Sequence, residues 1–209
     1  MNRRVRRLGF FASLAAASIA LTSCAGLSAF GEELSRAWQG VPATFTSYDQ
    51  AGNPIDEVHG TSFRVARDTR FDTTEVGSDG KTSTTPGEVL LISIGDSHIS
   101  HVGSSACLVQ DGLDPIGDAA DYVKFSNSQP GMPWLNDLRE KFQNQWHGRS
   151  KTILIRSQDG KPISVFAGNA VEVFATDVPK STWFRVDGKM LWCYRVDYTT
   201  YDTKLLSSP

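Results

Sequence analysis

The residues best suited to chemistry gather in one polar stretch, Asp96–Ser105, which holds two of the four histidines of the chain. On a strand, Asp96 and His98 would share one face and His101 would point to the other, because side chains alternate. A turn between the histidines would bring these three together as metal ligands, or as an acid and a base beside Ser104 as nucleophile. No GxSxG or HExxH signature accompanies them. We therefore predict ordinary polar groups here, with no catalytic residue, metal site or cofactor.

The segments that must position this stretch are mostly β in pattern. Alternating or continuously apolar runs, separated by turns rich in Gly, Asn, Asp and Pro, predict strands. We expect these strands at residues 44–48, 55–59, 62–66, 89–94, 100–109, 122–125, 152–156, 163–167, 170–175, 183–186 and 190–198. The polar run Asp68–Gly87 has no apolar period, so it is expected to be a long loop.

Two segments have helical patterns. Phe30–Trp38 carries early glutamates and ends before Gly40, which predicts a short N-terminal helix. Pro133–Trp146 begins with proline, is followed by Gly148 and has one apolar stripe, which predicts an amphipathic helix covering a sheet. The predicted fold class is α+β, mainly β. We expect an antiparallel, hairpin-rich sheet, or a partly closed barrel or sandwich, with these two helices.

The hairpin regions repeat themselves at a constant offset in residue number, 108 (160 − 52). The positions of the first copy recur in the second as Gln50/Gln158, Gly52/Gly160, Pro54/Pro162, Ile55/Ile163, Gly60/Gly168 and Val65/Val173. Tight turns reuse Gly and Pro, which explains part of the echo but not the second glycine of each copy. The alternatives are coincidence of turn chemistry and duplication of a hairpin unit over about 44–66 and 152–174. Duplicated units would pack with pseudo-twofold symmetry, and a ligand could sit between them.

Two cysteines, Cys107 and Cys193, lie in apolar, strand-like contexts. In an exported protein this even number favours a disulfide between them. Free cysteine also packs well as a small buried apolar group, so two separated thiols are the alternative.

The N-terminus predicts export. Met1–Arg7 contains four arginines, and the segment Leu8–Leu21 that follows carries no charge. This uncharged segment is too short to span a bilayer and has the length typical of a signal peptide. The following Leu21-Thr22-Ser23-Cys24 resembles the lipobox of bacterial lipoproteins. That resemblance implies removal of residues 1–23, lipidation of Cys24 and a location on the outer face of the cytoplasmic membrane. Residues 24–29 would be a short tether, and 30–209 a single β-rich domain held close to the membrane.

The charge of the mature chain excludes some partners. Without residues 1–23, 17 Lys and Arg (21 − 4) face 23 Asp and Glu, a net charge of −6. Nucleic-acid binding needs a basic surface, as does electrostatic adhesion to anionic lipid. We therefore expect no nucleic-acid partner, and contact with the membrane through the lipid on Cys24.

Several stretches along the mature chain are similar to a family of small Gram-positive bacterial lipoproteins defined only as a domain of unknown function. These stretches are Gly40–Thr44, Tyr48-Asp49, His59–Ser62, His101–Ser105, Arg156–Pro162, Ala175–Thr182 and Tyr198–Thr203. The resemblance implies a lipid-anchored envelope protein and carries over no functional residue.

Two functions follow from these observations. The first is a non-catalytic binding or envelope-assembly module close to the membrane, whose protein or envelope partner the sequence does not identify. The alternative is an envelope hydrolase or a metal-dependent enzyme that uses Asp96, His98, His101 and Ser104.

Overall fold

The structure is a computed structural model that describes residues 36–118 and 149–207, and it is mainly antiparallel β. Its strands are β1 (Pro42–Tyr48), β2 (Pro54–Thr61), β3 (Phe63–Arg67), β4 (Thr73–Val76), β5 (Thr82–Thr85), β6 (Leu90–Ile94), β7 (Ser97–His101), β8 (Ser105–Gln110), β9 (Gly117–Asp118), β10 (Lys151–Arg156), β11 (Pro162–Gly168), β12 (Val171–Ala175), β13 (Ser181–Val186), β14 (Lys189–Tyr194) and β15 (Asp197–Asp202). A 3₁₀ turn, η1 (Thr69–Phe71), and a terminal helix, α4 (Thr203–Ser207), complete the described elements.

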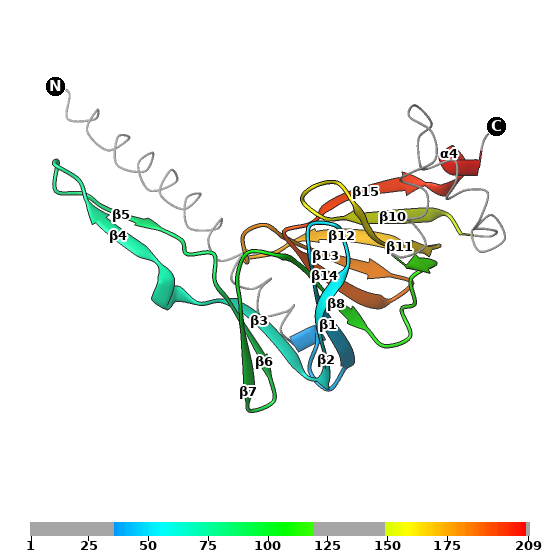
Figure 1. The fold of residues 1–209 in the computed structure, drawn as a ribbon, viewed down its shortest axis with the longest axis horizontal. Coiled ribbons are helices and arrows are strands. Elements are labelled where there is room, and N and C mark those ends of the chain that lie inside the picture. Colours follow the sequence, from blue (N-terminus) through cyan, green and yellow to red (C-terminus); the bar gives the residue numbers. More distant parts are fainter. Residues whose placement is uncertain (1–35, 119–148, 208–209) are drawn as a thin grey trace, which may run out of the picture.

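The mainly antiparallel β prediction is confirmed, and the sheets are layered rather than closed into a barrel (Figure 1). The predicted signal peptide, tether and Cys24 lie outside the described residues, as do the strand at 122–125 and the helix Pro133–Trp146. Of the predicted N-terminal helix, the last three residues are described, and Arg36 and Ala37 among them are helical.

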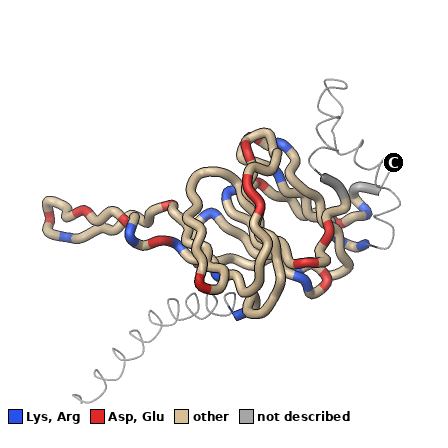
Figure 2. The backbone as a smooth tube through the Cα atoms, turned by 60° about the horizontal axis from the view of Figure 1, so that its bottom comes forward, with Lys and Arg blue, Asp and Glu red and all other residues tan. Residues whose placement is uncertain are grey.

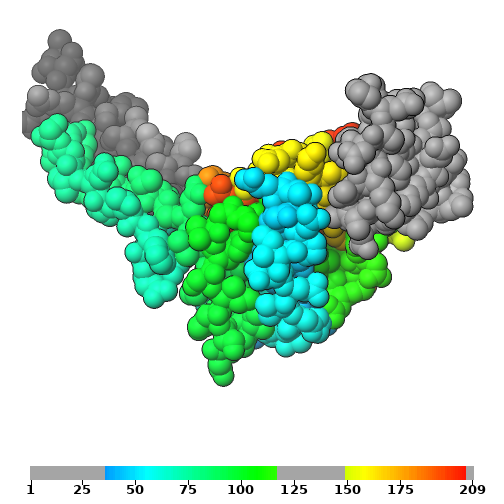
Figure 3. All heavy atoms as spheres, in the orientation of Figure 1, coloured from blue at the N-terminus to red at the C-terminus, as the bar shows by residue number. Residues whose placement is uncertain are grey.

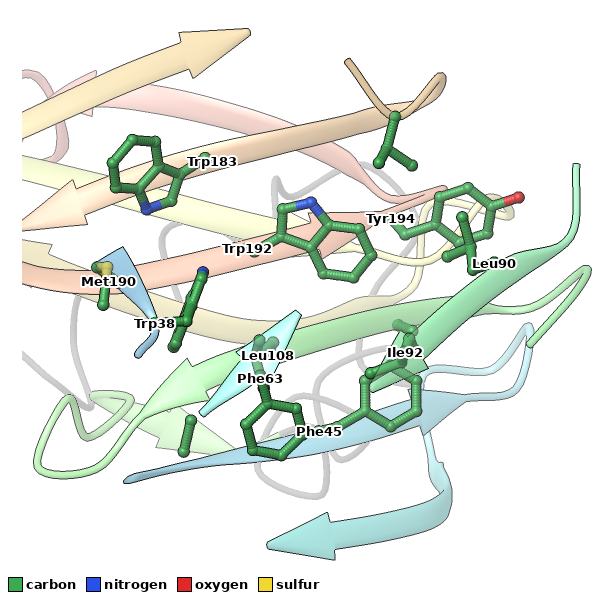
Figure 4. Packing of buried hydrophobic residues seen from close by; sticks show 13 residues of the cluster. Trp38, Phe45, Phe63, Leu90, Ile92, Leu108, Trp183, Met190, Trp192 and Tyr194 are labelled. Atoms are coloured by element: carbon green, nitrogen blue, oxygen red, sulfur yellow. The ribbon is translucent and has the colours of Figure 1, made fainter. Parts of the chain in front are cut away.

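A six-stranded sheet, in the order β12-β13-β14-β8-β1-β2, is the middle layer. The sheet β3-β6-β7 packs on one face and the sheet β15-β10-β11-β9 on the other. Adjacent residues of the central strands therefore enter different cores: Trp192 packs with Phe63 and Ile92, whereas Cys193 packs with Ile153 and Ile163. Figure 4 shows the first of these cores. Burial on both faces explains why Lys189–Tyr194 is apolar without alternation.

The two hairpins that carry the sequence echo have the same pairing register. In β1–β2, Thr44 faces His59; in β10–β11, Thr152 faces Ala167, which is the same pair shifted by 108. Each hairpin has its irregularity at the same place, before Tyr48 and before Arg156.

The strand pairing extends this equivalence beyond residues 44–66 and 152–174. In the first unit β3 pairs with β6 and β6 with β7, and in the second β12 pairs with β13 and β13 with β14 in the same way. The last strand of each unit then pairs with its first strand, β8 with β1 and β15 with β10. Equivalent residues of the two units differ by 108 in residue number up to β3 and by 92 from β6 onward. The first unit therefore contains additional chain between β3 and β6. We call β1–β8 the first repeat and β10–β15 the second.

The repeats are joined where β8 pairs with β14. Cys107 and Cys193 face each other in this ladder, and their sulfurs form a disulfide across 86 residues of sequence. The disulfide therefore links one repeat to the other.

Three expectations about the strands are wrong. The expected strand at 190–198 is divided into β14 and β15, because residues 195 and 196 belong to neither and Arg195 has a left-handed backbone (φ +50°). The run Asp68–Gly87 is not a structureless loop, because β4 and β5 form a two-stranded ribbon within it. The expected strand at 100–109 is divided into β7 and β8 by residues 102–104, where Gly103 has a left-handed backbone (φ +94°). A glycine there allows a reversal of direction that residues with a Cβ rarely adopt.

Candidate functional site

A groove runs between the two repeats and consists of two cavities. The turn cavity, about 750 Å³, is lined by Tyr48–Ala51, Gly103–Ser105, Gln158, Asp159 and Arg195. The strand cavity, about 720 Å³, is lined on one side by alternate β1 residues and on the other by Ile163, Ser164 and Phe166. Tyr48 lines both cavities, so they adjoin at this residue, and we call the two together the inter-repeat groove. The lining mixes hydroxyl, amide, carboxylate and aromatic groups.

The two hairpin turns beside the turn cavity contact each other directly. The Ser157 hydroxyl donates a hydrogen bond of 2.7 Å to the carbonyl oxygen of Gln50. Gly52 approaches so closely that a Cβ on it would lie 2.4 Å from the carbonyl oxygen of Pro162. Equivalent turns of the two repeats are therefore packed against each other, and glycine is required at the contact.

Arg195 has a left-handed backbone (φ +50°) although it has a Cβ, and of the described non-glycine residues with this backbone, which include Ser62, Lys180 and Asp187, it is the one that lines the groove. This conformation costs about 1–2 kcal/mol relative to an ordinary one. The offset of 92 makes Gly103 its counterpart in the first repeat, where the same left-handed position is filled without that cost.

The Arg195 guanidinium bridges the repeats. Nη1 donates to Oε2 of Glu88 at 2.5 Å, and Nη2 donates to Oε1 of Gln158 at 3.1 Å. Nε2 of Gln158 in turn donates to the carbonyl oxygen of Gly103 at 3.3 Å, which connects the two equivalent positions. Ser105 fixes the loop from the other side, with its hydroxyl donating to the Arg195 carbonyl at 2.6 Å.

Glu88 is shared between two cations. Lys180 donates a hydrogen bond to its second carboxylate oxygen. This hydrogen bond, together with the positive charges of Lys180 and Arg195, holds the pKa of Glu88 below its ordinary value of 4.5. The carboxylate is therefore ionised in the neutral range and ties the β3–β6 connection of the first repeat to the second repeat.

Of the polar residues expected from the sequence, Ser104 lines the turn cavity. His101 stands behind it: Nε2 donates to the Ser104 carbonyl at 3.0 Å, and the ring packs edge-on against Phe45 and Tyr194. His101 thus supports the loop that carries Ser104.

The other two residues are elsewhere. Asp96 lies in the exposed β6–β7 turn, and Nδ1 of His98 contacts the Ser93 hydroxyl at 3.1 Å on an exposed strand surface. Both histidines belong to β7 with no turn between them, so their side chains point to opposite faces and the convergence required for a metal site or a catalytic triad is not formed. Across residues 36–118 and 149–207, no three His, Cys, Asp or Glu side chains are grouped so as to hold a metal ion.

Sequence reasoning missed Arg195, Gln158 and Glu88. The turn around Gln158 was recognised as a hairpin, but its contact with the other repeat depends on tertiary packing. Gly103 and Arg195 are different residue types, so a comparison of the two sequences does not align them. Only the register of the strand pairs shows that they are equivalent.

No described helix is long and apolar enough to cross a membrane. No curated protein and no solved structure matches the chain significantly. A family model, described as a domain of unknown function (DUF5052), matches residues 6–206. The chain therefore belongs to the DUF5052 family.

Proposed function

We propose that this protein is a lipid-anchored, extracytoplasmic binding module that holds its partner in the inter-repeat groove close to the membrane. The support for anchoring is the sequence order of a basic start, an uncharged run and Leu21-Thr22-Ser23-Cys24. Two acyl chains on such a cysteine give stable membrane attachment, whereas one chain is marginal. A tether of residues 24–29 spans only about 20 Å when extended, so the groove stays near the bilayer surface.

The observation that carries the binding role is Arg195. A strained backbone retained at a surface cavity points to a function for the side chain, since local strain concentrates at such sites. The first repeat shows that glycine satisfies the same turn. The arginine side chain, held in place by Glu88 and Gln158, is therefore the feature that the second repeat keeps at a cost in stability.

The lining of the groove favours binding over catalysis. Its polar groups come from different strands and turns. His101 donates its hydrogen bond to the backbone carbonyl of Ser104, the candidate nucleophile, and not to its hydroxyl. We therefore place no reaction step at this site.

A photo-crosslinking amino acid at Ser104, in intact cells, tests the proposal. Ser100 is the matched control, because it is a nearby serine but exposed on β7, outside the groove. We expect a discrete adduct from position 104, absent from position 100 and lost when Arg195→Gly is added. Adducts of equal yield at both positions, or none at position 104, would contradict a binding role for the groove.

A further inference from the structure

The β4–β5 arm (residues 73–85) accounts for the difference in length between the repeats. The additional chain of the first repeat lies between β3 and β6, where the offset in residue number falls from 108 to 92. Every residue of β4 and β5 is exposed. Figures 1 and 3 show the arm extending away from the body of the protein. The second repeat closes the same connection without any such element, so the arm is not needed to complete the fold.

The base of the arm is built to hold a fixed direction. Asp68 is 4% exposed, and its carboxylate accepts hydrogen bonds from the Arg70 backbone and guanidinium. Asp72 binds Arg67 and also accepts from the backbone N–H of Gly87 at 2.9 Å. The Asp72–Gly87 hydrogen bond crosses from the outgoing to the returning segment, as does that from the Asp68 N–H to the Val89 carbonyl at 2.8 Å, so the two segments leave the body together.

The outer edge of β5 carries backbone groups that no described strand pairs with. Within the described residues, β4 and β5 pair only with each other. The Gly77 N–H donates to the Lys81 carbonyl at 2.8 Å, which makes that facing pair hydrogen-bonded. Since antiparallel pairs alternate, the N–H and C=O groups of Thr82 and Thr84 point outward. An isolated two-stranded ribbon is marginally stable in water, and an open edge is a template for another strand.

We propose that β5 pairs with β5 of a second copy of this chain, antiparallel and around a twofold axis. With Thr82 and Thr84 outward, the twofold register in which both residues form hydrogen-bonded pairs within β5 places Thr82 opposite Thr84 of the second copy. Ser83 then faces Ser83 of the second copy at the axis.

Charge decides between the two edges of the arm. The same arrangement on β4 would set Glu75 directly opposite Glu75 of the second copy, and facing like charges destabilise a sheet. The strand β5, Thr-Ser-Thr-Thr, has no charge. Figure 2 shows charged residues at the tip of the arm and at its base, and the charged residue between them, Glu75, belongs to β4. The β5 edge is therefore the self-complementary one.

The expected dimer is weak in dilute solution, because two such short strands form only a few new backbone hydrogen bonds in this register. Confinement to one membrane raises the local concentration, and a twofold axis normal to the bilayer keeps both anchors in the same leaflet. This part rests on the proposed lipid anchor, whereas the register follows from the arm alone.

Cysteine crosslinking of the full chain in its membrane tests the pairing. In the proposed register the Cα atoms of two Ser83→Cys residues lie about 4.5 Å apart, which is close enough for a disulfide. Glu75→Cys is the matched control on the same face of the ribbon and the other edge. We expect mild oxidation to give a covalent dimer for Ser83→Cys at least ten times more abundant than for Glu75→Cys or the unmodified chain. Equal yields, or no Ser83→Cys dimer, would overturn the proposal.

Two proline variants distinguish pairing along the β5 edge from crosslinking by random collision of two chains. Thr84→Pro removes an outward N–H of β5, and Thr74→Pro does the same on β4, because Thr74 and Thr84 face each other. Thr84→Pro should abolish the Ser83→Cys dimer and Thr74→Pro should leave it. Loss in both or in neither would contradict β5 pairing. Fractionation of the same samples reports anchoring separately, and crosslinking of the purified full chain at high concentration tests the register without a membrane.

Discussion

Arg195 and Gly103 occupy equivalent positions in the two repeats, and both have left-handed backbones (φ +50° and +94°). Gln158 connects them by accepting from the Arg195 guanidinium and donating to the Gly103 carbonyl. One repeat uses the residue that fits this turn without strain, and the other places a cation at the groove.

This pair predicts unequal effects of two substitutions at one site. Arg195→Gly removes the bridge but relieves the strain, so the free energy of unfolding should change by less than about 1 kcal/mol. Arg195→Ala removes the bridge and keeps the strain, and should lower that free energy by about 1–2 kcal/mol more than Arg195→Gly. Chemical denaturation of both variants measures the difference. A glycine variant less stable than the alanine variant would show that the backbone at 195 is not strained.

The two hairpin turns offer a matched pair of glycines. Gly52→Ala places a Cβ 2.4 Å from the Pro162 carbonyl oxygen, whereas Gly160→Ala meets nothing within 4 Å; both positions have positive φ. Both variants should lose about 1 kcal/mol for the backbone. Gly52→Ala should lose a further 1–3 kcal/mol (about the cost of overpacking) because the repeats must separate. Denaturation curves with equal midpoints would mean that the turns do not touch.

Acid should weaken the contact that Glu88 makes with Lys180 and Arg195. The folded pKa of Glu88 is lowered, so its stabilisation is complete above the ordinary value of 4.5 and is lost as the pH falls through the lower folded pKa. The difference in Tm between the unmodified protein and Glu88→Gln should therefore be largest near neutral pH and shrink below about pH 4.5. A Tm difference that stays constant from pH 7 to pH 3 would contradict this.

The disulfide between Cys107 and Cys193 should make the joint between the repeats resistant to unfolding. In the chain-entropy model, a crosslink across 86 residues contributes about 4 kcal/mol. Reduction, or the double change Cys107→Ala and Cys193→Ala, should lower Tm while the β circular-dichroism spectrum persists. Mass spectrometry without reductant provides the direct check: two alkylated thiols in the unfolded, unreduced protein would rule out the disulfide.

Local chemistry made much of the fold predictable. The turns at Gly52 and Gly160 are set by Gly and Pro at fixed positions, and β14 is a short apolar run of the kind expected for a strand buried on both faces. The arm was missed because β4 and β5 are exposed on both faces and so show no apolar alternation. The Thr-rich segments flanking Ser78-Asp79-Gly80 have high β propensity, which was the available signal.

The candidate site was less predictable. Ser104 was identified from its polar surroundings, and the structure places it in the groove. Asp96 and His98 were candidate partners because they are close to it in sequence, but Asp96 lies in the β6–β7 turn and His98 on the exposed surface of β7. Arg195 could be identified only by aligning the two repeats, and that alignment follows from the strand pairing and not from identical residues.

The lipid anchor is the central claim, because the membrane-proximal role depends on it. The most direct measurement is the mass of the N-terminal peptide of the membrane-extracted protein, compared with that of Cys24→Ser. The proposal predicts that Cys24 is the first residue and carries a diacylglyceryl group, and that Cys24→Ser is unprocessed or released from the membrane. An unmodified Cys24 inside a longer peptide, or a Cys24→Ser protein still cleaved there and membrane-bound in low and high salt, would contradict it.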